Sequence, residues 1–370
     1  MTQLPRPAPN VISVPATTPF VAPEELARRI GRTALVRLGA NESAFGPAPR
    51  AIAAMQAAVP LTSLYADPES VDLRTALAAR HGCDMENIVV GSGIDELLGL
   101  IVRTFCSPND VALMTRGSYP TFAYHVTGHA VSLATVAALP GGVVDIKGLI
   151  ETARVRRPKI VYLANPDNPS GSFAGRENVA RLRAALHPQT LFVLDEAYAD
   201  FVDPALLPPE GIDGQTIRLR TFSKAYGMAG ARIAYALAPA EAIATFQKIR
   251  LHFGINRTAQ VGALAALDEP AYLAGVVAEV ARGRDEYYAL GERLGVRTLR
   301  SFTNFVCFEI GSREAAEAMV HALLERGVFV RKPGAPPIDG YVRVTVGTAD
   351  ERALFATAFA EALAELHVRS

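Results

Sequence analysis

This sequence has few lysines, three cysteines and no formal net charge. These shortages bear on which kinds of protein it can be. Only five of the 37 basic residues are lysines, and the others are arginines. The formal net charge at pH 7 is zero, so the charge balance does not favour binding to nucleic acid or to an anionic membrane surface. Small molecules are therefore the expected partners.

The three cysteines, Cys83, Cys106 and Cys307, are far apart and form no CxxC pair. This spacing supports neither a disulfide framework nor a zinc site, so we expect free thiols, no metal and a reducing compartment. Long apolar runs are also missing. The first residues carry prolines instead of an apolar signal segment, and no stretch approaches the roughly 20 apolar residues of a membrane span. A cytoplasmic protein is expected.

Apolar strands alternate with helical patterns from residue 87 onward, which is typical of a mostly parallel sheet covered by helices. The predicted strands are 87–90, 111–114, 131–134, 160–164, 191–194, 217–221 and 231–237. After a long predicted helix at 270–293 come short strands at 305–310, 329–331 and 341–346, which indicate a smaller α+β domain. The expected fold class is α/β, with a large doubly wound domain and a small one.

The domain boundaries follow from these patterns. Residues 1–40 are expected to form an N-terminal arm and part of the small domain. Residues 41–265 form the large domain and residues 266–370 the small C-terminal domain. Five prolines among the first 20 residues favour an extended arm over a folded unit.

Lys224 needs a chemical explanation, because arginine serves wherever charge alone is required. An amine can form a Schiff base with a carbonyl group, and a guanidinium cannot. Lys224 follows a predicted strand and precedes Gly227 and Gly230, where the backbone can approach a ligand closely. The alternative is an ordinary lysine in a surface turn.

Gly91-Ser92-Gly93 leads from a predicted strand into a helix and presents free backbone N–H groups, which suit a phosphate. The segment lacks the GxGxxG pattern of dinucleotide sites. Asp95 and Glu96 can equally be acids that complement the helix dipole, so a structural role stays open.

Polar residues also follow two other strands. The segment Asn165-Pro166-Asp167-Asn168-Pro169 comes at the carboxyl end of a strand, where open α/β sheets bind ligands. It is either a rigid turn or a source of ligand-binding amides. Asp195 and Glu196 follow an apolar strand, and a carboxylate there requires a cation or a protonated ring nitrogen. A hydrolytic carboxylate pair is the rival interpretation, but neighbouring strand residues point to opposite faces.

Arg331 and Arg343 lie on or near short apolar strands of the predicted small domain. Such arginines need an anionic partner, and a carboxylate or phosphate of a ligand fits their fork of donors. An internal salt bridge is the alternative.

Together these segments resemble the fold type I pyridoxal-phosphate aminotransferases, and within them the histidinol-phosphate aminotransferase-like group. Eight motifs occur in the family's order: Asn41-Glu42 with Gly46-Pro47, Tyr65-Ala66-Asp67-Pro68, Gly91 to Glu96, Pro120-Thr121-Phe122, Asn165 to Gly171, Asp195 to Tyr198, Ser223 to Gly227 with Arg232, and Arg343.

The resemblance implies catalytic roles around a pyridoxal 5'-phosphate cofactor. Lys224 would bond to the cofactor and then act as general base and acid. Asp195 would keep the pyridinium nitrogen protonated. Asn168 and Tyr198 would bind the ring's phenolate oxygen, and Phe122 would stack on the ring.

The same resemblance implies a phosphate-binding set. It consists of the N–H groups of Gly93 and Ile94 with the side chains of Ser223 and Arg232. Tyr65 would reach this phosphate from a partner subunit, so a homodimer with a shared active site is implied.

For the substrate, the resemblance implies that Arg343 holds a carboxylate or phosphate and that Arg331 adds a second anion contact, with Asn41 and Phe20 also at the substrate. The implied reaction is a ping-pong transfer of an amino group from histidinol phosphate, or a similar substrate, to 2-oxoglutarate. Phe20 lacks the hydroxyl of a tyrosine often present in the arm of such enzymes, so an aromatic aminotransferase for phenylalanine or tyrosine is the nearest alternative. A decarboxylase or lyase on the same fold is more distant, and a scaffold without catalysis is the non-enzyme alternative.

Overall fold

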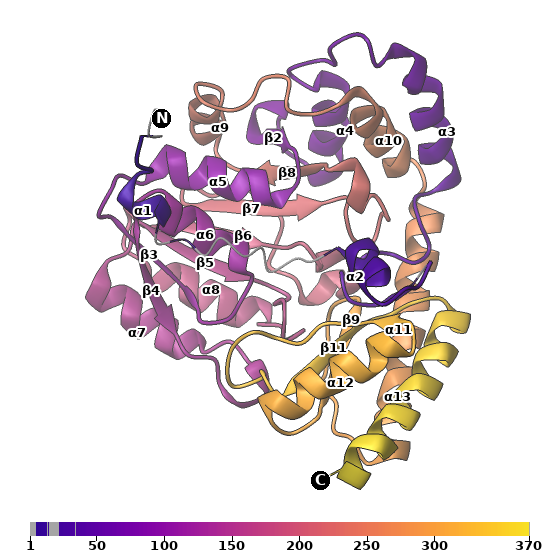
Figure 1. Ribbon diagram of the computed structural model, residues 1–370. Helices are drawn as coiled ribbons and strands as arrows, with labels where there is room; N and C mark the ends of the chain where they lie inside the picture. The colour runs from indigo at the N-terminus through magenta and orange to yellow at the C-terminus, as the bar shows by residue number, and fades with distance from the viewer. Residues whose placement is uncertain (1–4, 13, 15–21, 34, 370) are drawn as a thin grey trace.

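A seven-stranded sheet forms the centre of the computed structural model, which describes residues 5–12, 14, 22–33 and 35–369 (Figure 1). The strand order is β2-β8-β7-β6-β5-β3-β4. β8 runs antiparallel to both of its neighbours, and the other pairs are parallel. The mostly parallel sheet expected from the sequence is therefore confirmed. Its strands are β2 (Ile88–Gly91), β3 (Val111–Thr115), β4 (Ser132–Val136), β5 (Ile160–Ala164), β6 (Leu191–Asp195), β7 (Thr216–Thr221) and β8 (Ala234–Leu237).

The strand predicted at 231–237 begins three residues late. Ala229–Ala231 forms a 3₁₀ turn, η6, and Arg232 has a φ of 57°, outside the extended region. The other short 3₁₀ turns are η1 (Val59–Leu61), η2 (Met85–Asn87), η3 (Pro140–Gly142), η4 (Ala199–Phe201) and η5 (Pro204–Leu206).

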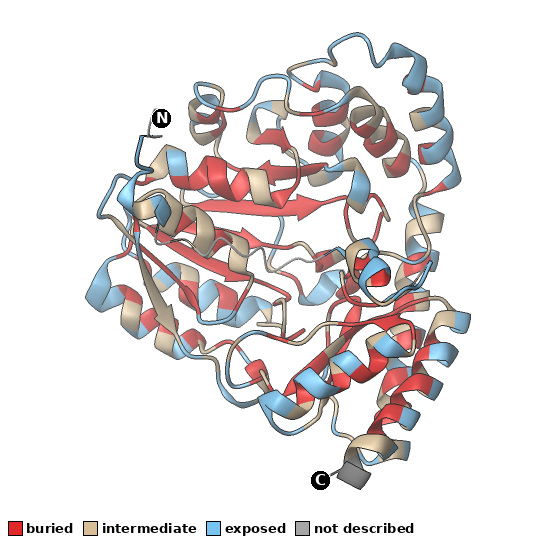
Figure 2. Cartoon of the chain, viewed as in Figure 1, coloured by how far each residue is buried: buried red, intermediate tan, exposed pale blue. Residues whose placement is uncertain are grey.

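Helices cover both faces of this sheet. One hydrophobic core joins the strands to α5 (Ile94–Phe105), α6 (Pro120–Gly128) and α9 (Ala240–Phe246). A second core joins the opposite face to α7 (Ile146–Arg156) and α8 (Arg176–Ala185). Figure 2 shows buried residues running along the strands, with exposed residues on the outer sides of the helices. Strands buried on both faces explain the continuous apolar runs in the sequence.

A third core joins β2 and β8, at one end of the sheet, to α3 (Pro49–Ala58), α4 (Val71–His81) and α10 (Arg257–Leu267), which pack together. A Cβ at Gly262 of α10 would lie 2.7 Å from the Met55 side chain of α3, so the two helices are in close contact. α10 ends at Leu267 and α11 begins at Pro270, and the domain boundary at 265/266 stays a prediction.

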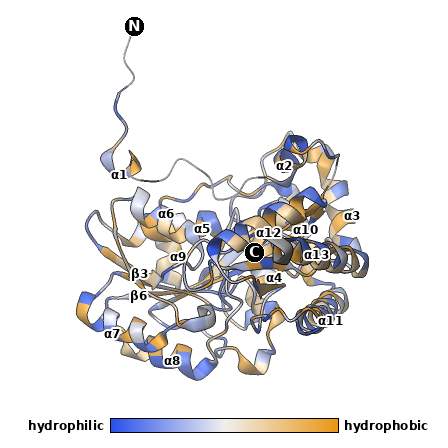
Figure 3. Ribbon diagram, turned by 60° about the horizontal axis from the view of Figure 1, so that its bottom comes forward, coloured by the Kyte–Doolittle hydropathy of each residue, from blue (hydrophilic) through white to orange (hydrophobic). Residues whose placement is uncertain are grey.

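The C-terminal elements pack around a separate aromatic core below the sheet in Figure 1, which includes Phe308, Phe355 and Phe359. They are α11 (Pro270–Leu294), β9 (Phe305–Glu309), α12 (Arg313–Glu325), β10 (Val328–Phe329), β11 (Tyr341–Thr345) and α13 (Ala349–Arg369). In Figure 3, α11, α12 and α13 each carry both hydrophobic and hydrophilic residues, as expected for helices with one face on a core. β11 pairs antiparallel with β9.

The N-terminal segment contributes to the same part of the molecule. After α2 (Pro23–Arg29), β1 (Val36–Arg37) pairs in parallel with β10. Residues 9–12 form one helical turn, α1 (Pro9–Ile12), instead of the extended arm predicted there, and Asn10 Nδ2 donates to Gly128 O at 2.6 Å. Within the described residues no single helix is long and apolar enough to span a membrane, although the sharply bent pair α10 and α11 together would meet those criteria of length and composition.

Gly227, in the segment after β7, lies against the segment that leads from β1 to α3. Its φ is +69°, and a Cβ would lie 2.1 Å from the Gly46 carbonyl oxygen. The close approach predicted at this glycine is therefore to the chain's own backbone. At Gly230 a Cβ would meet no atom within 4 Å, so this second glycine is not required by packing.

Replacement of Gly227 by alanine is expected to lower the free energy of unfolding by about 3 kcal/mol, because it combines a backbone clash with an unfavourable φ. Urea denaturation followed by circular dichroism measures this. Gly230→Ala is the matched control and should change the free energy by less than about 1 kcal/mol. Equal losses in the two variants would contradict this assignment.

Candidate active site

Two adjoining cavities lie at the carboxyl edge of the large sheet. β5, β6 and β7 are neighbours and parallel, so the residues that follow them meet at this edge. The smaller cavity has a volume of about 400 Å³ and the larger about 680 Å³. They share Ala40, Tyr119, Asn168 and Lys224 in their linings. The predicted residues that line the smaller cavity are Ile94, Asn168, Asp195, Tyr198, Ser223, Lys224 and Arg232.

The Lys224 amine lies between the two cavities. Its Nζ donates to Asn41 O at 3.0 Å and lies 5.6 Å from the centre of the Tyr198 ring. Burial, reinforced by the positive charge of Arg343, lowers the pKa of Lys224 to about 8. A lysine with such a pKa has a neutral, nucleophilic fraction at neutral pH.

Asp195 ends β6 and is 4% exposed. Its Oδ2 accepts from the Tyr162 hydroxyl at 2.7 Å, and its Oδ1 accepts from Ala197 N at 3.1 Å. Burial raises the pKa of Asp195 to about 6 in spite of these hydrogen bonds. Because both donors are neutral, this carboxylate can still accept a cationic group from the cavity.

Glu196 points to the other side of the sheet. Its carboxylate accepts from Arg218 at 2.7 and 2.9 Å and from Arg220 at 2.9 Å. The rival interpretation, in which Asp195 and Glu196 form one hydrolytic pair, is therefore wrong. Strand alternation separates them as expected.

A hydrogen-bonded chain connects the large sheet to the C-terminal elements across the cavities. Asn41 Nδ2 donates to the Tyr198 hydroxyl at 2.9 Å. Arg343 Nη1 donates to Asn168 Oδ1 at 2.5 Å, and Nη2 donates to Gly39 O at 3.0 Å. Asn168 and Tyr198 thus lie beside the lysine. Burial raises the pKa of Tyr198 to about 12, which keeps its hydroxyl protonated.

Arg343 has no acidic partner within 4.0 Å among the described residues, so the predicted alternative of an internal salt bridge does not hold there. Its Nε is buried without a hydrogen-bond partner, and burial lowers the pKa of the guanidinium. Arg331 forms an antiparallel backbone bridge to Arg343, and both side chains line the larger cavity. An anionic ligand would satisfy this arrangement.

The other end of the smaller cavity is built by the start of α5 and by η6. Arg232 Nη2 lies 3.9 Å from Asp95 Oδ2. A Cβ on Gly93, whose φ is +91°, would lie 2.3 Å from that nitrogen. Gly93 is therefore required for Arg232 to reach the helix N-terminus, where the N–H groups favour an anion.

The structure contradicts the position expected for Phe122. This side chain is fully buried in the core under the sheet and stacks on Tyr162, with ring centroids 4.6 Å apart. Tyr119, which precedes α6, lines both cavities instead, and its hydroxyl donates to Asp95 Oδ1 at 2.7 Å. Tyr119 directly precedes Pro120, the first residue of α6, and has a non-helical ψ of 117°. The proline, which disfavours a helical conformation at the residue before it, was the signal that could have separated Tyr119 from Phe122.

Tyr65 lies outside both cavities. Its side chain is 79% exposed and its ring is 4.6 Å from that of Phe253. Phe20, predicted as a substrate contact, lies outside the described residues.

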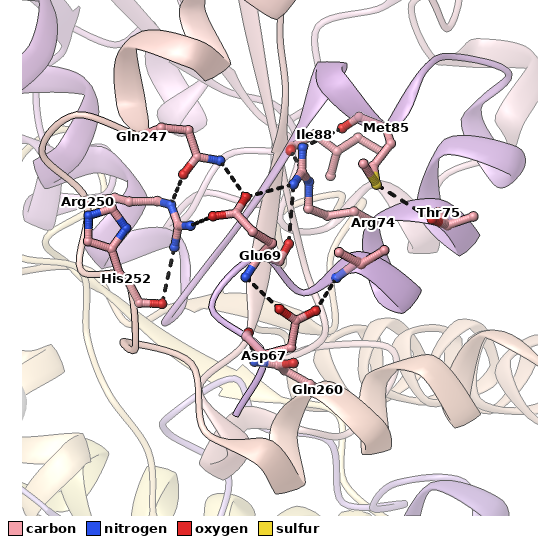
Figure 4. Close-up of polar contacts among 11 residues, drawn as sticks. Asp67, Glu69, Arg74, Thr75, Met85, Ile88, Gln247, Arg250, His252 and Gln260 are labelled. Carbon is pink, nitrogen blue, oxygen red and sulfur yellow. Dashed lines mark hydrogen bonds and ion pairs between the residues drawn. The ribbon is translucent and has the colours of Figure 1, made fainter. Parts of the chain in front are cut away.

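The loop that follows Tyr65 is held by buried arginines (Figure 4). Glu69 accepts from Arg250 at 2.6 Å and from Arg74 at 3.2 Å. Asp67 accepts from the backbone N–H groups of Glu69 and Val71 at 2.9 and 2.7 Å. This network fixes the loop that follows Tyr65, and we infer that it also keeps the Tyr65 side chain directed outward.

The chain belongs to the class I and II aminotransferase family, which it matches over residues 33–359. Within that family it is similar to histidinol-phosphate aminotransferases. The protein of that name from Sphingopyxis alaskensis is 38% identical over 347 residues, which cover 89% of this chain and 91% of the relative. The one from Moorella thermoacetica is 33% identical over 369 residues, which cover 96% and 92%. A solved histidinol-phosphate aminotransferase from Sinorhizobium meliloti, in complex with pyridoxal-5'-phosphate, has a TM-score of 0.94, 41% identity and 99% coverage of both chains.

The depressed pKa of Lys224 predicts a pH-dependent stability. Between pH 8 and about 10.5 the unfolded chain binds more protons at this lysine than the folded chain, so stability rises with pH in this window. In protein freed of bound ligands, Lys224→Met should therefore be more stable than the unchanged protein by about 3 kcal/mol at pH 7, and the difference should shrink toward pH 10.5.

Urea denaturation at several pH values measures that difference. Lys248→Met, at an exposed position, is the control and should show no such trend. A difference for Lys224→Met that stays constant from pH 7 to 10.5 would refute the assignment.

Proposed function

We propose that this protein is a pyridoxal-phosphate-dependent aminotransferase that takes the amino group of histidinol phosphate and transfers it to 2-oxoglutarate. The observation that carries the proposal is the partly buried Lys224 amine, which lies between a cavity that contains Asp195 and a second cavity lined by arginines. Membership of the aminotransferase family and similarity to histidinol-phosphate aminotransferases over nearly the whole chain support it.

The smaller cavity fits the cofactor. Its volume, about 400 Å³, is within the range of small-molecule sites. Asp195 is a buried carboxylate with two neutral donors, and it would hold the protonated ring nitrogen. The N-terminus of α5, Ser223 and Arg232 would hold the phosphate. When bound, the cofactor supplies an electron sink for the carbanion at the substrate Cα.

The residues around the ring have separate tasks. Lys224 would bond to the cofactor aldehyde and later carry a proton between the substrate Cα and the cofactor C4′, and a pKa of about 8 suits a base that works near neutral pH. Asn168 and Tyr198 would donate to the ring oxygen. We assign the stacking position to Tyr119, because it lines the cavity and is held by Asp95.

The larger cavity would take the substrate. Arg343 would bind its carboxylate or phosphate, with Arg331 as a second anion contact. Asn41, which is buried and lines this cavity, would orient the substrate near the amine. A ping-pong order follows, because donor and acceptor would use the same arginines in turn.

Lys224→Ala is expected to lower kcat by at least about 10⁴-fold and to remove the visible absorbance of the bound cofactor. The assay follows glutamate formed from 2-oxoglutarate, with histidinol phosphate and phenylalanine as parallel donors. Faster turnover of histidinol phosphate supports the proposal, and faster turnover of phenylalanine would make the protein an aromatic aminotransferase instead. Release of carbon dioxide without glutamate would indicate a decarboxylase.

We also propose a cytoplasmic homodimer with a shared active site, in which Tyr65 reaches the cofactor phosphate of the partner. Tyr65 and Phe253 are in contact and bring together two segments rich in exposed apolar residues, here called the Tyr65 surface: Val59, Leu61, Leu64 and Tyr65 in one, and Ile249, Leu251 and Phe253 in the other. Exposed apolar groups gathered in this way are typical of an interface. The three cysteines are unpaired, which agrees with a reducing compartment.

A charge placed on the Tyr65 surface should separate the subunits. For Leu251→Glu, 65% exposed in the single chain, we expect a monomer in analytical ultracentrifugation and at least a tenfold loss of activity, because a glutamate would have to be buried at the interface. Val155→Glu changes an even more exposed apolar residue, on α7, and should remain dimeric and active. A dimeric Leu251→Glu variant with full activity would rule out this interface.

A further inference from the structure

The larger cavity carries more positive charge than a single carboxylate requires. Besides Lys224, which is assigned to the cofactor, the cavity is lined by one acid, Glu317, and by four cationic side chains, which are Arg313, Arg331, Lys332 and Arg343. One bidentate arginine is sufficient to bind a carboxylate. The excess of cations therefore favours a ligand with more than one negative charge at this end of the cavity.

Lys332 is the cation that can exchange its present ion-pair partner, Glu317, for an anionic ligand. Its Nζ lies 3.2 Å from Glu317 Oε1, and Arg313 Nε lies 3.3 Å from the same oxygen. The side chains of Glu317 and Arg313 are 54% and 57% exposed, whereas that of Lys332 is only 16% exposed. Lys332 is thus the inner member of the cluster, and Arg313 would remain to neutralise Glu317 if Lys332 left.

The backbone next to Lys332 is fixed, so the side chain can move by itself. Lys332 follows Arg331, which is bridged to β11. Pro333 is buried. Ala335 packs closely on Gly117, because a Cβ placed on Gly117 would lie 2.7 Å from the Ala335 Cβ. A lysine carries its charge on a flexible stem of four carbons and can reorient over such a base.

We propose that Lys332 is a specificity-determining residue: its side chain leaves Glu317 and pairs with the phosphate of the substrate. This inference rests on the proposed function. A phosphate monoester carries about 1.5 to 2 negative charges at pH 7 and offers three acceptor oxygens. Arg343 and Arg331 can serve some of these oxygens, and Lys332 supplies a further charge. Since the Glu317 side of this ion pair is 54% exposed and such pairs contribute little to stability, exchanging Glu317 for phosphate is not opposed by a large loss. Substrates with a neutral tail would gain nothing from Lys332.

The test compares Lys332→Met and Glu317→Gln in the holoenzyme. The donor half-reaction, followed by cofactor absorbance, is titrated with histidinol phosphate and with histidinol, which lacks the phosphate. We expect Lys332→Met to raise the apparent dissociation constant for histidinol phosphate about tenfold, the effect of one charge-assisted hydrogen bond. The change for histidinol should be several times smaller. Glu317→Gln should tighten the binding of histidinol phosphate about threefold, because it frees Lys332 in advance.

Lys147→Met is the matched control, because it removes one positive charge from an exposed ion pair with Glu151 on α7. It should change neither constant. Equal effects of Lys332→Met on histidinol phosphate and histidinol, no effect on either, or weaker binding in Glu317→Gln would overturn the proposal and leave a purely structural ion pair.

Inorganic phosphate separates this inference from the proposed function. It is used as a competitive inhibitor of the half-reaction with glutamate, and its inhibition constant should rise several-fold in Lys332→Met. If the unchanged protein rejects histidinol phosphate but loses phosphate inhibition in the variant, the proposed donor is wrong and the role of Lys332 stands. If the unchanged protein accepts histidinol phosphate, and Lys332→Met binds histidinol phosphate and inorganic phosphate as tightly as the unchanged protein does, the role assigned to Lys332 is wrong.

Discussion

The arrangement of this site depends on one constraint, the parallel alignment of three neighbouring strands. β5, β6 and β7 run in the same direction, so the residues that follow them reach the same edge of the sheet. Asn168, Asp195 and Lys224 are far apart in the sequence and come together for this reason. β2 has the same direction, because β8 is antiparallel to both β2 and β7. The start of α5 is therefore placed at that edge as well.

Burial of charge at this edge opposes folding and makes the site reactive. Lys224 loses hydration and faces the positive charge of Arg343, and Asp195 is buried with neutral donors. Both pKa values move toward neutrality, which is typical of groups that exchange protons or bind a charged ligand. The surrounding hydrophobic cores and the fixed loop contact at Gly227 hold these groups in place. The same features therefore serve both stability and chemistry.

The sequence predicts most of the sheet because its strands are buried on both faces and appear as apolar runs between turns. It also predicts Lys224 and Asp195, whose chemistry is unusual for their surroundings. Phe122 could not be separated from Tyr119 by motif alone, since both are aromatic, and only the start of α6 at Pro120 leaves Tyr119 outside the helix and Phe122 within it. The single turn at residues 9–12 is too short for any periodic signal. The loop after Tyr65 is held by an ion pair between Glu69 and Arg250, which are 181 residues apart in the sequence.

Asp195 and Glu196, at the end of β6, point to opposite faces of the sheet, so one is available to a ligand and the other stabilises the fold. Arg218 and Arg220 are two residues apart on β7 and therefore share one face, where both reach Glu196. Two buried guanidinium groups on one strand face require an acid on the neighbouring strand. Glu196 supplies it, on the face opposite the cavity. Asp195, one residue earlier, has no arginine on its own side within salt-bridge distance among the described residues. It is therefore the carboxylate that remains available to a ligand.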